Sequence, residues 1–175
     1  LDVALADATG TADTLTINFN DTAGANNSTV DLRTTGVETL VLDWTDATDT
    51  DVADATLDVD AINAATVTIT GADVDVGHAL SLQTLDTDTT TVDASGYYGI
   101  LTATSGTAIA TSFTARGDRT HNLTGSSKND TFTISTATTN ADMTIDGNGG
   151  TDTLSMVLGT GAQDFDSITD VDTIN

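Results

Sequence analysis

The chain of 175 residues contains no cysteine and no proline. Without cysteine, disulfide bonds and thiolate chemistry are excluded, so the fold needs another means of cross-linking. Without proline, the turns must be made by glycine, asparagine and aspartate, which bond their own turns or adopt left-handed conformations. The first and last residues fall within strand-like patterns, which predicts that the chain is part of a longer protein.

Basic residues are scarce. Four lysines and arginines face 27 acidic residues, for a net charge of −23, and Glu38 is the one glutamate among the acids. Such a charge excludes the basic patches needed for nucleic-acid binding. The many carboxylates also repel one another, and divalent cations are the simplest means of neutralising them. A salt-adapted surface would explain the charge but not the near absence of glutamate, whereas short carboxylates suit cation-binding turns.

Aromatic residues make up only 4% of the chain, and no apolar run approaches the ~20 residues of a membrane span. We therefore expect no membrane insertion by this segment. The apolar residues are mainly Ala, Val, Leu and Ile, which alternate with threonine in short runs such as residues 14–19, 66–70 and 131–135. This alternation predicts β-strands with one apolar face.

Glycines follow many of these runs at intervals close to the length of one solenoid coil. Gly71 and Gly96 are 25 residues apart, Gly96 and Gly117 are 21 apart, and Gly125 and Gly147 are 22 apart. A period near twenty favours an all-β fold, a parallel β-solenoid of the β-roll kind. A calcium-binding β-sandwich remains the alternative, because its strands also end in regularly spaced turns.

Two stretches near the start are similar to two near the end: residues 10–17 to 149–156, and residues 35–40 to 169–174. The matches keep their order and nearly the same offset. We interpret residues 1–140 as one β-rich module, and residues 141–175 as a calcium-binding turn followed by the start of a second, similar module.

One motif is specific. Residues 147–154 read Gly-Asn-Gly-Gly-Thr-Asp-Thr-Leu, close to the calcium-binding nonapeptide G-G-x-G-x-D-x-U-x. Gly147 and Gly150 permit unusual backbone angles, Asn148 replaces a glycine, and Asp152 supplies a carboxylate. Calcium prefers such hard oxygen ligands from a flexible turn. We therefore predict a Ca²⁺ site at Gly147, Asn148, Gly150 and Asp152.

Weaker copies of the motif precede it. Residues 125–132 place Asp130 at the aspartate position, with Asn129 directly before it, although Lys128 stands where glycine is expected. The interval from Asp130 to Asp152 is one coil, so the two turns would stack and could share a cation. A third and poorer copy places Asp13 in the same role.

Residues 147–154 resemble a repeats-in-toxin (RTX) calcium repeat. Residues 36–40 and 170–174 are similar to strands that recur in RTX-type bacterial surface-layer proteins and large adhesins. The resemblance implies type I secretion, folding triggered by external calcium and a location on the bacterial cell surface. It implies a structural module that assembles with copies of itself, or a repeat of a giant adhesin that serves as spacer or ligand-binding arm, with cell-surface polysaccharide as a further partner. True RTX blocks have many tandem repeats, and this chain departs from that pattern.

Catalytic signals are weak. His78 and His121 are isolated, and no hydrolase, metalloprotease or nucleotide-binding motif occurs. A polysaccharide-active β-helix enzyme is a remote alternative, because such sites need basic and aromatic side chains in a groove. Tyr97 and Tyr98 are expected to pack within the fold. We expect no enzymatic activity.

Overall fold

The computed structural model describes residues 2–4, 10, 12–19, 33–44, 64–71, 79–137, 143–160 and 167–175. Within these ranges the fold is all-β, without a helix. Consequently no helix long and apolar enough to cross a membrane occurs there. The strands are β1 (Asp2–Ala4), β2 (Thr14–Phe19), β3 (Arg33–Thr35), β4 (Thr39–Trp44), β5 (Thr66–Gly71), β6 (Ala79–Thr84), β7 (Thr91–Gly96), β8 (Ile100–Thr104), β9 (Ser112–Ala115), β10 (His121–Thr124), β11 (Thr131–Ala137), β12 (Thr144–Asp146), β13 (Thr153–Val157), β14 (Ile168–Thr169) and β15 (Thr173–Ile174).

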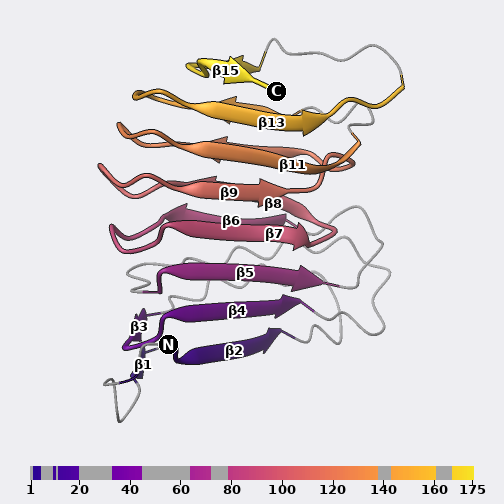
Figure 1. The fold of residues 1–175 in the computed structure, drawn as a ribbon. Coiled ribbons are helices and arrows are strands. Elements are labelled where there is room, and N and C mark those ends of the chain that lie inside the picture. Colours follow the sequence, from indigo (N-terminus) through magenta and orange to yellow (C-terminus); the bar gives the residue numbers. More distant parts are fainter. Residues whose placement is uncertain are drawn as a thin grey trace.

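The strands stack as a parallel β-solenoid (Figure 1). One sheet has the order β15-β13-β11-β9-β7-β5-β4-β2, a second has the order β14-β12-β10-β8-β6, and β1 pairs with β3. All the pairings are parallel, as expected when the chain winds in one direction and each coil lies on the last. The predicted β-solenoid is confirmed, and the antiparallel sandwich does not describe these residues.

The coil length is close to the predicted period. Paired residues in consecutive coils lie 19 positions apart at Ser112 and Thr131, and 27 apart at Thr39 and Thr66. Gly117 and Gly125, whose short separation breaks the glycine series, follow two strands of one coil, β9 and β10. The longer early coils contain residues outside the described ranges.

The core lies between the two sheets. In β5 every second side chain is buried, as the alternation of threonine with Val67 and Ile69 predicts. The rings of Phe113 and Phe132 stack in neighbouring coils, with centroids 5.5 Å apart. Each large apolar side chain buried in this way contributes about 1.5–3 kcal/mol to stability. A narrow stack can therefore hold together without disulfides.

A hydroxyl-bearing residue begins each strand of the larger sheet, and these residues are in register through the stack. Threonine is favoured here because a β-branched side chain suits a half-buried or exposed position on a pleated sheet. The column consists of Thr14, Thr39, Thr66, Thr91, Ser112, Thr131, Thr153 and Thr173.

The register also bears on the internal similarity. Thr14 and Thr153 occupy the same place in their coils, as do Thr39 and Thr173. The similar residues at both ends of the chain therefore stand at equivalent positions of their coils. The division proposed at residue 140 falls in residues 138–142, outside the described part, and remains a prediction.

Candidate metal centre at the stacked glycine-rich turns

Acidic residues gather at one corner of the solenoid, where the chain enters the larger sheet. We call Asp13, Glu38, Asp130, Asp152 and Asp172 the carboxylate ladder; each directly precedes a strand of that sheet. The carboxylates of Glu38, Asp130, Asp152 and Asp172 accept hydrogen bonds from the backbone N–H of the residue at the same corner of the preceding coil. These bonds are Asp13 N to Glu38 Oε2 (2.8 Å), Thr111 N to Asp130 Oδ1 (2.5 Å), Asp130 N to Asp152 Oδ1 (2.7 Å) and Asp152 N to Asp172 Oδ2 (2.8 Å).

Asp130 is fully engaged in this ladder. Its side chain is 1% exposed, and its second oxygen accepts the backbone N–H of Ser126 at 2.6 Å. The side chain of Asn129 also joins two coils, because its Oδ1 accepts the N–H of Thr151 at 3.0 Å. Charge-assisted bonds to backbone amides are strong, so a cation at Asn129 and Asp130 would compete with them. The calcium predicted at these two residues remains a prediction, for which the structure leaves no free carboxylate oxygen.

The glycines of the motif are explained by the same ladder. A Cβ on Gly147 would lie 2.5 Å from Asp152 Oδ2, and one on Gly125 would lie 2.6 Å from Asp130 Oδ2. Asp130 and Asp152 thus each pack their carboxylate against the glycine five residues before them. Gly150 has φ of 121° and also packs on the Lys128 carbonyl of the preceding coil, which leaves no room for a side chain.

Asp152 differs from Asp130 in one respect that matters for metal binding. Asp152 is 1% exposed, and its Oδ2 is buried without a hydrogen-bond partner among the described residues. Burial raises the pKa of this carboxyl group, the backbone bond from Asp130 lowers it, and the charges of Asp130, Asp172 and Asp170 raise it. An unpaired buried carboxylate oxygen is costly, and a cation or a proton would relieve that cost.

A pocket of about 230 Å³ adjoins Asp152 at the last glycine-rich turn. It is lined by Asn148, Gly149, Gly150, Asp152, Asp170, Val171 and Asp172. The structure thus brings the predicted residues Asn148, Gly150 and Asp152 to one place and adds two aspartates from the next coil. Sequence reasoning used the segment of Asp170 and Asp172 only as a strand pattern; the signal available was the 20-residue interval from Asp152 to Asp172, one coil.

The described residues contain no group of three or more acidic or histidine side chains close enough to hold a metal by themselves. The pocket therefore fits calcium in part: it offers one buried free oxygen, and further ligands would have to come from carbonyl groups or water. Asp13 also has a buried unpartnered Oδ2, packed against Gly10. It belongs to a separate place, because β11, β9, β7, β5 and β4 lie between its strand and that of Asp152.

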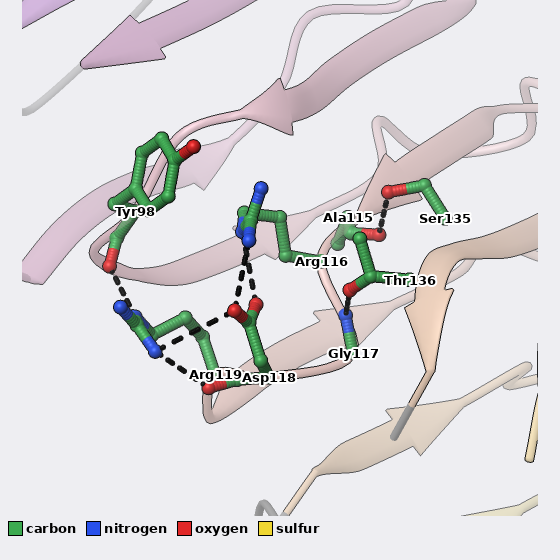
Figure 2. A network of polar contacts seen from close by, with 8 residues as sticks. All are labelled: Tyr98, Ala115, Arg116, Gly117, Asp118, Arg119, Ser135 and Thr136. Carbon is green, nitrogen blue, oxygen red and sulfur yellow. Dashed lines mark hydrogen bonds and ion pairs between the residues drawn. The ribbon is translucent and has the colours of Figure 1, made fainter. Parts of the chain in front are cut away.

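The opposite corner, where the chain leaves the larger sheet, carries an arginine cluster (Figure 2). The Arg116 guanidinium lies 4.1 Å from the ring centroid of Tyr98 and forms an ion pair with Asp118 at 2.8 Å. Arg119 donates from Nε to the Tyr98 carbonyl at 2.6 Å. The hydrogen bond from Arg116 lowers the pKa of Asp118. Both guanidinium groups are used to join consecutive coils, as a packing role for Tyr98 requires.

His121 lies beside this cluster and points into the core. It occupies a column filled by Leu80 and Leu101 in the two preceding coils. Its Nδ1 accepts the N–H of Leu101 at 3.1 Å, which places the proton on Nε2, an atom without a partner among the described residues. Burial is the main reason why the pKa of His121 falls from 6.5 to about 4; Arg119 and Arg116 lower it further, while Asp118 and the Arg116 backbone raise it.

This histidine predicts acid sensitivity. Because the folded chain keeps His121 neutral down to about pH 4 whereas the unfolded chain protonates it below 6.5, stability is lost as pH falls through that window. The free energy of unfolding falls by about 3 kcal/mol across this window. Above pH 6.5, His121 makes no contribution to the pH dependence of stability. His121→Leu should remove that part of the acid loss, at a cost of about 1 kcal/mol at neutral pH for the unpaired Leu101 N–H. Urea unfolding of the wild type and of His121→Leu between pH 4 and 6.5 measures this difference in acid sensitivity. Stability that falls in parallel with pH in both proteins would contradict the role of His121.

Tyr97 is buried, as expected for a packing residue, and His121 has no access to solvent. His78 lies outside the described residues. Comparisons with protein-family models, with curated proteins and with solved structures found no match. Function is therefore inferred from the geometry of the chain alone.

Proposed function

We propose that this chain is a non-enzymatic, calcium-stabilised structural module of a secreted bacterial surface layer, which assembles with copies of itself. The observation that carries the proposal is the buried, unpartnered Oδ2 of Asp152 beside a pocket that also contains Asp170 and Asp172. In a chain with net charge −23, a divalent cation at this position would satisfy the orphan oxygen and reduce repulsion between adjacent coils.

Calcium is favoured over magnesium by the kind of ligands available. Calcium accepts about six to eight oxygens in flexible geometry, whereas magnesium demands a near-ideal octahedron. The pocket is open, and its wall combines carboxylates with a glycine-rich backbone, which suits the less demanding ion. Binding to the folded chain alone would make the fold more stable outside the cell, where calcium is plentiful.

A structural role also follows from how the solenoid is built. The stack is held by bonds that run from coil to coil, through the carboxylate ladder on one corner and the arginine cluster on the other. Such a stack is a stiff, elongated element in which each coil contacts only its neighbours. This form suits a surface scaffold, and the acidic surface favours assembly that depends on divalent cations.

Asp152→Asn tests the metal proposal, because asparagine keeps the Oδ1 acceptor for Asp130 N–H but loses the negative charge. Wild-type protein should gain about 2.7 kcal/mol at a calcium concentration 100-fold above Kd, and the variant should lose that gain. In EGTA the variant should match or exceed the wild type, because repulsion with Asp170 and Asp172 is reduced.

The measurement is thermal unfolding in calcium, magnesium or EGTA, with light scattering to follow assembly. Asp88→Asn is the matched control, since it removes one charge from an exposed residue remote from the pocket. The proposal fails if wild-type Tm does not respond to calcium, or if both variants respond as the wild type does. Calcium-stabilised protein that stays monomeric would favour an adhesin spacer over a surface layer.

A further inference from the structure

Gly149 is a glycine that the fold does not require. A Cβ at this position would meet only Ser127 Cα, at 3.9 Å, which is an ordinary contact, and its φ lies outside the left-handed region. Gly147 and Gly150, on either side, could not accept a side chain without displacing backbone of the neighbouring coils. The glycine at position 149 therefore needs an explanation other than packing.

The residue before it supplies one. Asn148 is the only asparagine in the sequence that is followed by glycine. It is exposed, with φ of 69°, and the described residues offer its carboxamide no hydrogen-bond partner. Its side chain is thus free to turn toward its own backbone, and the absence of a Cβ on Gly149 leaves the following nitrogen open to the carboxamide carbon.

We propose that Asn148 is a site of spontaneous deamidation. The Gly149 backbone nitrogen loses its proton to solvent base and attacks Cγ of Asn148, and the side-chain nitrogen leaves with a proton as ammonia. The resulting five-membered succinimide is opened by one water molecule, which gives aspartate or isoaspartate. No oxidant or reductant is needed. Among the described residues, one bond restrains the reacting nitrogen, from Gly149 N–H to the Gly147 carbonyl at 2.9 Å.

The position of Asn148 gives this reaction a structural consequence. Asn148 lines the pocket together with Asp152, Asp170 and Asp172. Conversion to aspartate places a fourth carboxylate in that pocket, and conversion to isoaspartate adds a methylene to the main chain two residues before the tightly packed Gly150. The modification therefore changes the charge of the pocket with time, whether or not a metal is bound there.

The test is to incubate the folded chain in mildly alkaline buffer made with water enriched in heavy oxygen, followed by peptide mass mapping. The expected result is labelled aspartate and isoaspartate at residue 148, with the other asparagines unchanged. Gly149→Ala should fold with an unchanged Tm and lose the product. Should that variant unfold, Asn148→Gln serves instead, because glutamine cannot close the five-membered ring readily.

Three results would overturn the proposal. They are an unmodified Asn148 after prolonged incubation, equal product in the wild type and Gly149→Ala, and equal conversion at Asn129 or Asn122, which are also exposed. None of these depends on calcium, so failure here and failure of the proposed metal site can be told apart.

Discussion

Gly147→Ala is expected to lower the free energy of unfolding of the last coils by about 3 kcal/mol or more. The new Cβ would collide with the Asp170 carbonyl oxygen of the next coil and would lie 2.5 Å from Asp152 Oδ2. Asp152 is held by the bond from Asp130 N–H to its Oδ1, and Gly147 N–H donates to the carbonyl of Thr169, next to Asp170, so the added methyl group would have to push these coils apart. Thermal unfolding by circular dichroism, with limited proteolysis to locate the opened coils, measures the effect.

Gly149→Ala is the matched control, since it adds the same methyl group two residues away where space is available. Its Tm should stay close to that of the wild type. Equal Tm values for the Gly147 and Gly149 variants would show that coils do not pack against Gly147 as closely as described. If proteolysis of Gly147→Ala cut first near β5, the destabilised region would not be the last coils.

Asp130→Ala is expected to cost about 3–5 kcal/mol, because it removes the acceptor of two backbone amides in a buried corner. Thr111 N–H and Ser126 N–H both donate to this carboxylate, and the described structure gives neither another acceptor. The loss should be of similar size in calcium and in EGTA, since both oxygens are already occupied by amides. Urea unfolding in the two conditions measures it.

Asp88→Ala removes an exposed carboxylate and should change stability by less than about 0.5 kcal/mol, which provides the baseline. A loss for Asp130→Ala that appears in calcium but vanishes in EGTA would mean that the residue acts through a metal. A loss no larger than that of Asp88→Ala would mean that the ladder contributes little to stability.

The solenoid could be predicted from sequence because it needs strands with one buried face and coils of regular length, and both produce recognisable local sequence patterns. Alternation of threonine with apolar residues, as in residues 66–70, marks strands with one buried face, and glycines near a twenty-residue period mark the coil length. Strands β2, β5 and β11 lie where the alternation places them. The position of Gly147 and Asp152 on one glycine-rich turn could be predicted in the same way.

The role of the aspartates could not be predicted from sequence. A glycine followed five residues later by aspartate is expected for a calcium turn, and equally for a carboxylate that accepts an amide of the preceding coil. Asp130 and Asp152 share this spacing, yet only Asp152 keeps an unpartnered oxygen. The contribution of Asp170 to the pocket depends on the stacking of two coils, which no local pattern contains.

The burial of His121 in the core also could not be predicted from local sequence. Its neighbours in sequence, Thr120 and Asn122, are polar, and no other histidine or motif stands near it in the sequence. Parallel pairing instead aligns it with Leu101, and the side chain enters the core. A residue's place in a solenoid is set by its register with other coils, which the chain specifies only through the whole stack.

The central claim is that the ladder aspartates first of all hold neighbouring coils together, and that at the stacked turns of Asp130 and Asp152 only the second oxygen of Asp152 is left for a cation. Amide hydrogen exchange of Asp130 N–H and Asp152 N–H, measured by NMR with calcium and with EGTA, tests it directly. Both amides should exchange slowly in either condition, because each donates to a carboxylate of the next coil. Fast exchange in EGTA, with protection appearing only when calcium is added, would contradict the claim and assign the cohesion of the coils to the metal.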